Sequence, residues 1–235
     1  MPLPIGHALA GVVLQQVRPG FFFTNRWRDA LFFMLLANLP DADFLPGLLC
    51  GRPNLYHHGA FHSLGAALGV AALGAGFFCL KKRPVAAGRC GPVAAGRCGP
   101  VAAGRCGPVA AGRCGPVAAG RYGRFWGPAA MIFLLFCSHL LLDLFALDLV
   151  APFGLPLFWP FSGRYFIASR PFFINITRSS ASGDFFPSLF NGHNLAAALR
   201  EVVILGSLAL AAAWLRARAE KRSRGRGEKG GISGG

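Results

Sequence analysis

Long uncharged runs of apolar residues constrain the fold of this chain more than any other feature. Residues 63–80 contain no charge, and residues 195–215 carry charges only near their start. A helix needs about 20 apolar residues to cross the hydrocarbon core of a bilayer. Only 14% of the 235 residues are charged and 54% are hydrophobic, whereas roughly 25% are charged in an average soluble protein. We therefore expect a membrane protein.

Five apolar segments predict an all-α, multi-pass membrane bundle of about four to five helices. These segments are residues 3–17, 27–39, 63–80, 125–150 and 195–215. The last three are long enough to span a bilayer, whereas the first two are marginal and are expected to be short, tilted or re-entrant. Residues 1–80 and 125–215 then form the two parts of one membrane domain.

An eight-residue repeat separates these two parts. The sequence PVAAGRCG begins at positions 84, 92, 100 and 108, and a fifth copy from position 116 carries Tyr122 in place of cysteine. Gly and Pro in every unit do not sustain a helix. We predict a flexible, low-complexity basic insert over residues 81–124 with no site of its own. Metal or lipid binding by its Cys and Arg residues is the alternative, although the cysteine spacing fits no short zinc knuckle.

Most of the positive charge lies in two blocks. The net charge is +15, from 24 Lys+Arg and 9 Asp+Glu, and the blocks fall within residues 81–124 and 216–235. The positive-inside rule places both blocks on the cytoplasmic side, beside anionic lipid headgroups. We expect residues 216–235 to be a disordered basic tail. No specific nucleic-acid partner is expected, because aromatic residues are interleaved with the cations only near residues 122–126, and no signal peptide is expected.

The fourth segment contains a histidine and an aspartate at helical spacing. His139 and Asp143 lie four residues apart, which places them on one face of a helix. Ionisable residues inside an apolar segment are expensive and are usually functional. The pair suits two ligands of a metal site, and the alternative is a His–Asp hydrogen bond that joins helices.

Two further carboxylates, Asp41 and Asp43, follow the second segment. In an extended backbone they would project to one side. Their mutual repulsion is relieved by a divalent cation between them. The alternative is a helix end with solvated acids.

Three of the six histidines, His57, His58 and His62, come just before the third segment. Neutral imidazole is the commonest protein ligand for zinc. A helix that starts near Gly59 leaves open which two of these rings bind. His7 stands alone in the first segment, and His193 lies in a polar stretch where we expect an interfacial cap.

Membrane topology brings these residues together. With both basic blocks in the cytoplasm, one set of side chains falls on the non-cytoplasmic side of the membrane. The set is Asp41, Asp43, His57, His62, His139 and Asp143, joined by His7 if the first segment spans the bilayer. They supply more ligands than one tetrahedral zinc accepts, which predicts more than one ion. Clustered divalent ions activate water and support in-line phosphoryl displacement. We therefore predict a metal-dependent hydrolase whose substrate is a phosphodiester or a phospholipid-like molecule.

Two other functions use the same residues. One is an ion or metal transporter, and the other is a structural or regulatory membrane protein whose polar side chains only join helices. A serine hydrolase fits less well, because the sequence contains no G-x-S-x-G element.

The motifs resemble those of the YdjM-type family of membrane-bound, metal-dependent hydrolases. That family carries an early His, an L-P-D-x-D element, an H-R-G-x-T-H-S element, an S-H-x-x-x-D helix and a P-F-S segment. The corresponding positions here are His7, residues 39–43, residues 57–63, residues 138–143 and residues 160–162. The resemblance spans about residues 1–170 and is interrupted by the repeat.

The family is similar in its motifs to the helical zinc-dependent phospholipase C and single-strand nuclease group. By that resemblance, the metal ligands are His7, Asp41, Asp43, His57, His62, His139 and Asp143. They would hold zinc, with manganese or magnesium as alternatives, and a water activated there with Asp41 and Asp43 would be the nucleophile. His58 replaces the family's Arg and Phe61 its Thr, so substrate binding is assigned to Arg164, Ser162 and His58.

Overall fold

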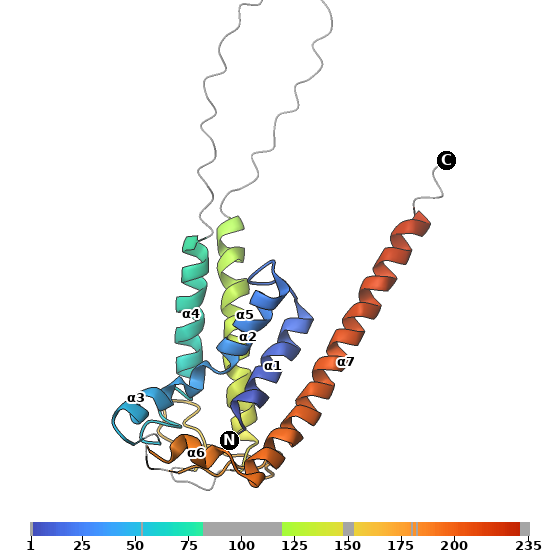
Figure 1. Ribbon diagram of the computed structural model, residues 1–235. Coiled ribbons are helices and arrows are strands. Elements are labelled where there is room, and N and C mark those ends of the chain that lie inside the picture. The colour runs from blue at the N-terminus through green and yellow to red at the C-terminus, as the bar shows by residue number, and fades with distance from the viewer. Residues whose placement is uncertain are drawn as a thin grey trace, which may run out of the picture.

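The structure is a computed structural model that describes residues 2–52, 54–81, 119–147, 153–179, 181 and 183–230. In these ranges every regular element is a helix, and the only strand-like pairings are two isolated bridges. The elements are α1 (Pro4–Val17), α2 (Arg26–Ala37), the 3-10 helix η1 (Leu39–Asp43), α3 (Phe44–Leu49), α4 (Leu64–Lys81), α5 (Ala119–Leu144), α6 (Phe185–Leu189) and α7 (Gly192–Gly230) (Figure 1). The all-α prediction is confirmed.

Two of these helices are long and apolar enough to cross a membrane. The spans are Phe125–Leu144 within α5 and Gly192–Arg222 within α7. A third candidate combines Arg26–Ala37 with Leu39–Leu49, which are bent by 55° relative to each other. The apolar part of α4, Leu64–Leu80, is shorter than the two full spans. A count of four to five membrane helices therefore remains a prediction.

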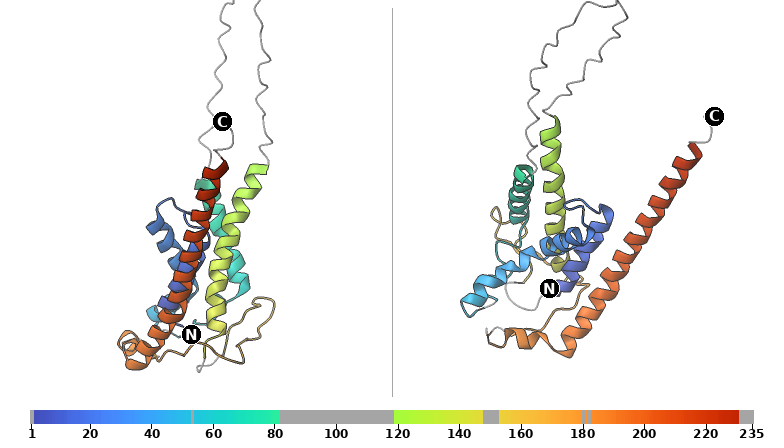
Figure 2. Two further views of the ribbon diagram at one scale, coloured as in Figure 1. Left: turned by 90° about the vertical axis from the view of Figure 1, so that its right-hand side faces the viewer. Right: turned by 45° about the horizontal axis from the view of Figure 1, so that its top comes forward.

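Small residues set the close packing of the bundle. Helix α4 lies along α5, and α1 lies between α2 and α7 (Figures 1 and 2). Ala67, Ala71 and Ala75 recur every fourth residue on α4 and are buried, so they form a small-residue face that lets two helices approach. On α1, a Cβ at Gly11 would lie 2.7 Å from the carbonyl oxygen of Phe33. This contact requires glycine where α1 crosses α2.

Helix α7 lies on the outside and diverges from the other helices toward its C-terminal end (Figures 1 and 2). Large apolar side chains such as Val203, Leu210 and Trp214 are exposed along it, as expected of a helix that contacts lipid. The helix continues to Gly230, so the expected disordered tail is wrong for most of its length. Residues 211–222 are strong helix formers, and Arg216 pairs with Glu220 one turn later at 3.5 Å.

The boundaries of α5 differ from the expected segment at both ends. It ends at Leu144 instead of continuing to residue 150, because the backbone turns and Ala146 pairs with Phe173. It begins at Ala119, inside the fifth copy of the repeat, although that copy was predicted to be flexible. The rest of the repeat, at residues 82–118, lies outside the described residues.

The order of the helices brings the chemistry-bearing residues to one end of the bundle. The start of α1, the end of α2, the start of α4 and the end of α5 meet near the N-terminus (Figure 1). The end of α4, the start of α5 and the basic end of α7 lie at the opposite end (Figure 1). Side chains that lie far apart in the sequence can therefore form a single site.

Candidate metal centre

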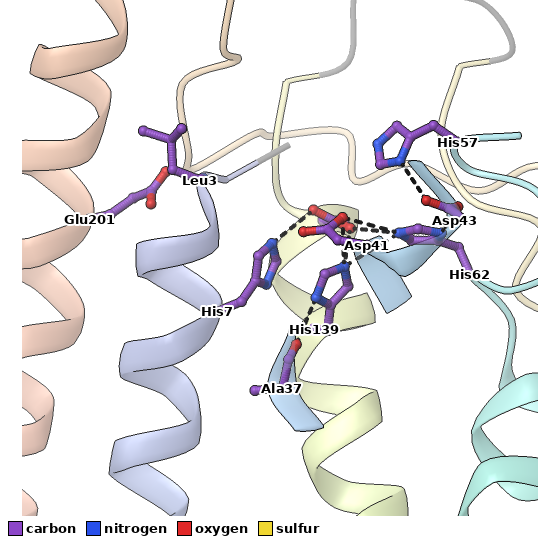
Figure 3. Close-up of polar contacts among 10 residues, drawn as sticks. Leu3, His7, Ala37, Asp41, Asp43, His57, His62, His139 and Glu201 are labelled. Atoms are coloured by element: carbon purple, nitrogen blue, oxygen red, sulfur yellow. Dashed lines mark hydrogen bonds and ion pairs between the residues drawn. The ribbon is translucent and has the colours of Figure 1, made fainter. Parts of the chain in front are cut away.

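Four potential ligands from three segments converge at this end. Asp41 comes from η1, His62 from the turn before α4, and His139 from α5 (Figure 3). Asp143 lies one turn after His139 on α5. One ligand atom of each residue lies within 4.8 Å of those of the other three. The four side chains are at most 12% exposed.

The distances suit a shared cation. His139 Nε2 lies 3.0 Å from Asp143 Oδ2, 3.3 Å from His62 Nε2 and 3.5 Å from Asp41 Oδ1. His62 Nε2 lies 3.6 Å from Asp143 Oδ2 and 3.8 Å from Asp41 Oδ1. Two nitrogens that bind one tetrahedral zinc at about 2.0–2.1 Å are roughly 3.3 Å apart. We refer to these four residues as the first cluster.

The end of α2 orients the His139 ring. His139 Nδ1 lies 2.8 Å from the carbonyl oxygen of Ala37, which closes α2. A carbonyl oxygen can only accept, so Nδ1 donates its N–H there. In the neutral ring, Nε2 then presents its lone pair to the first cluster, as is usual for histidines that bind metal.

Asp41 and Asp43 do not project to one side, so the extended geometry expected for them is wrong. They lie in a 3-10 helix, in which three residues complete a turn and positions two apart point in different directions. Asp41 faces α5, whereas Asp43 Oδ2 lies 2.9 Å from His62 Nδ1 and its Oδ1 lies 3.1 Å from His57 Nδ1. A carboxylate beside the outer nitrogen of a ligating imidazole fixes the ring. Asp43 therefore positions His62 and lies outside the first cluster.

Burial and charge act in opposite directions on the two histidines beside Asp43. Burial is the main influence on His57 and lowers its pKa to about 3. Burial also disfavours the charged form of His62, but the neighbouring carboxylates of Asp41 and Asp43 outweigh this and raise its pKa to about 9. Without metal, the His62 ring is therefore charged at neutral pH and balances part of the acidic charge that a divalent cation would balance.

His7 extends the first cluster toward α1. Its ring is fully buried and stacks on His139 with a centroid distance of 3.7 Å. His7 Nε2 lies 3.5 Å from Asp143 Oδ1, and in the described ranges neither ring nitrogen has a hydrogen-bond partner. The two oxygens of Asp143 thus face different imidazoles, an arrangement that suits a carboxylate bridging two ions.

A second group of histidines adjoins the first cluster. The buried rings of His57, His58 and His62 each offer a ligand atom within 4.8 Å of the others. Helix α4 begins at Leu64, so all three histidines lie in the preceding turn and the helix expected from Gly59 starts later.

A known protein family matches most of the chain. The family model described as "YdjM inner membrane protein" matches residues 1–220. The chain belongs to the YdjM inner membrane protein family. No curated protein and no solved structure matched it. The family resemblance seen in the sequence is confirmed, whereas a hydrolytic reaction and the side of the membrane that the site faces remain predictions.

Among the described contacts of this YdjM-family chain, none joins the predicted substrate-binding residues Arg164 and Ser162 to either group of histidines. Arg164 is exposed, and its backbone N–H donates to Ser162 Oγ at 3.2 Å. The segment nevertheless packs beside the start of α4, where Leu64 N donates to the carbonyl oxygen of Leu157. His193 is exposed, and its Nε2 donates to the carbonyl oxygen of Asn175. It belongs to neither group of potential metal ligands.

Glu201 on α7 is a polar residue near the site that the sequence did not single out. It is 1% exposed, and its Oε1 accepts a 2.9 Å hydrogen bond from Leu3 N at the start of α1. Leu3 caps α1 without a side-chain hydrogen bond, so Glu201 caps this helix from another element. A Cβ on Gly6 would lie 2.6 Å from Glu201 Oε2. The feature of the sequence that could have identified Glu201 is its position as an acidic residue within an apolar segment.

Proposed function

We propose that this YdjM-family protein is a membrane-embedded, divalent-metal-dependent hydrolase of the phosphoric ester class. The observation that carries the proposal is the first cluster, in which two buried carboxylates and two buried imidazoles from three segments meet. A set of nitrogen and oxygen ligands suits zinc, with manganese or magnesium as alternatives.

The buried carboxylates support the presence of a cation. Both oxygens of Asp41 and both oxygens of Asp143 are buried, and none of them has a hydrogen-bond partner among the described residues. His62 balances only part of this buried acidic charge, and a bound divalent cation would offset the cost of burying the rest. The donor set and these oxygens therefore fit a divalent ion.

The residues of the first cluster differ in what they can contribute. A divalent ion bound there would lower the pKa of a water and polarise a phosphoryl oxygen. Asp41 Oδ1 faces the rings of His139 and His62, so its other oxygen, Oδ2, would be the one to accept the proton of an attacking water. Asp43 acts on the reaction through the ring of His62, and His7 supports Asp143.

Opposite ends of the bundle would then face opposite sides of the inner membrane. The basic end of α7 and the start of α5 would lie in the cytoplasm beside anionic headgroups. The first cluster would face the non-cytoplasmic side, where a lipid or a small phosphodiester could reach it. We propose the bilayer itself and such a substrate as the partners of the protein.

Hydrolysis assays in proteoliposomes test this function. A para-nitrophenyl phosphodiester and phospholipids are offered to the metal-loaded protein, and we expect hydrolysis that His139→Ala abolishes. His193→Ala is the matched control, because it removes an exposed histidine outside both groups. No hydrolysis of any ester by metal-loaded protein would contradict the proposal.

The bent pair Arg26–Ala37 and Leu39–Leu49 gives specific support to a second candidate, a metal transporter. Interrupted spanning helices often line transport sites, and the 55° bend lies next to Asp41. Zinc uptake into proteoliposomes, followed with an internal fluorescent indicator, distinguishes the two functions. Flux without hydrolysis would favour transport.

A further inference from the structure

We infer that His57, His58 and His62 form a second cation site, which would use Nδ1 of His62, because Nε2 of that ring faces the first cluster. A histidine that binds an ion at each ring nitrogen does so as an imidazolate. This inference rests on the proposed metal-binding function and deepens it. It also gives His58 a ligand role in place of the substrate-binding role expected from the sequence. The ion that fits best is zinc or another metal that prefers imidazole.

The geometry of the three rings carries the inference. The ring centroids of His57 and His58 are 4.2 Å apart, and those of His58 and His62 are 5.2 Å apart. All three residues are at most 7% exposed. Three imidazoles with one open position are a known zinc ligand set. An ion among these rings would be shielded from bulk water.

The backbone at His58 explains how adjacent residues can face one site. Successive side chains of an extended chain point to opposite faces. His58 has a φ of 58°, and no other non-glycine residue among those described has a positive φ. This left-handed turn brings its ring beside that of His57. A conformation that a bulky side chain seldom adopts, at a cluster of potential ligands, points to a functional role for that side chain.

The neighbouring residues add charge and support to the second site. Asp43 contacts Nδ1 of His57 and Nδ1 of His62, so its carboxylate lies beside two of the three rings. Phe44 stacks on His57 with a centroid distance of 3.9 Å. An acid and an aromatic wall thus hold the His57 ring, and the acid favours a cation in the adjacent space.

Cobalt titration tests the second site. Metal-free, detergent-purified protein is titrated with Co²⁺ while the visible absorption of the bound ion is followed, and metal per chain is measured after dialysis. We expect His58→Gly to lose one ion and its absorption bands relative to wild type. Glycine adopts a positive φ freely, so the helical circular dichroism should be unchanged.

Companion variants separate the failure of this inference from failure of the proposed function. His58→Asn also tolerates the left-handed turn and should lose the same ion, which covers the case in which His58→Gly does not fold. His139→Ala should lose an ion of the first cluster and keep the His58-dependent one. Unchanged stoichiometry and spectrum in His58→Gly, with an ion still lost in His139→Ala, would overturn this inference alone. No ion in wild type would overturn both.

Discussion

Two buried aspartates in this protein have opposite environments. Asp29, in the first turn of α2, is fully buried and accepts hydrogen bonds at 2.8–3.3 Å on both carboxylate oxygens. The donors are the backbone N–H groups of Gly20, Phe22 and Phe23 and the side-chain amide of Gln15. Asp29 therefore holds the turn between α1 and α2 in place.

The side chain of Asp143 is equally enclosed, but no donor from the described part of the chain is aligned with either of its oxygens. Its described contacts are with imidazole nitrogens at 3.0–3.6 Å. A buried carboxylate with backbone donors stabilises the fold, whereas one surrounded by other potential ligands needs a cation. Hydrogen-bond partners, and not burial, therefore distinguish the structural Asp29 from the candidate ligand Asp143.

Asp143→Ala gives the largest expected effect, because it removes a carboxylate that faces both His139 and His7. We expect bound metal to be lost and phosphodiester hydrolysis to fall by about a thousandfold, or about 4 kcal/mol. Metal-dependent stabilisation should also vanish, as seen by thermal unfolding with and without chelator. A variant that keeps its chelator-sensitive unfolding temperature would contradict the ligand role.

Asp29→Ala tests whether Asp29 has a structural role alone. Loss of this carboxylate leaves three backbone N–H groups without their acceptor, and we expect the free energy of unfolding to fall by about 3 kcal/mol. Metal per folded chain should equal that of wild type. Metal loss from the folded Asp29→Ala protein would show that the two aspartates do not have separate roles.

The pH dependence of stability distinguishes metal-free from metal-loaded protein. The pKa of His62 is raised to about 9 in the folded protein, against about 6.5 in the unfolded chain. The resulting stability is fully present below about pH 6.5 and is lost as the pH rises through 9, by about 1 kcal/mol per pH unit above neutrality. We expect this loss only without metal, because a bound ion takes the place of the proton.

Thermal unfolding between pH 6 and pH 9, with and without zinc, measures this difference. His62→Gln, which cannot carry the charge, should remove the pH dependence of the metal-free protein. A slope that is the same in the loaded and the metal-free protein would argue against His62 as a ligand.

Glu201→Ala gives the smallest expected effect, because it removes one hydrogen bond at the start of α1. We expect a loss of about 1 kcal/mol in the free energy of unfolding and a several-fold weaker metal affinity, since α1 carries His7. Glu201→Gln keeps an acceptor for Leu3 N and should restore most of both values. Equal metal affinity in wild type, Glu201→Ala and Glu201→Gln would show that Glu201 does not position His7.

The sequence predicted the helices better than it predicted their ends. Apolar length located α1, α2, α4, α5 and α7, because burial in lipid or in the bundle demands such runs. The continuation of α7 beyond residue 215 follows the high helix propensity of the charged residues up to 222, which an apolar-length criterion does not register.

For the candidate site, local spacing was informative and long-range geometry was not. His139 and Asp143 follow from a separation of four residues on a helix. The different directions of Asp41 and Asp43 depend on the 3-10 helix that begins at Leu39 and contains Pro40 in its first turn. The approach of Glu201 to Leu3 joins residues 198 positions apart, and no local pattern encodes such a contact.

Metal content measured by plasma mass spectrometry tests the central claim most directly. Wild type, the double variant His139→Ala/Asp143→Ala and Asp29→Ala are purified in detergent without chelator. We predict two or more zinc or manganese ions per chain in wild type and in folded Asp29→Ala, and loss of the ions of the first cluster in the double variant. Wild-type protein that holds no ion, even after zinc or manganese is added, would contradict the claim that this cluster is a metal centre.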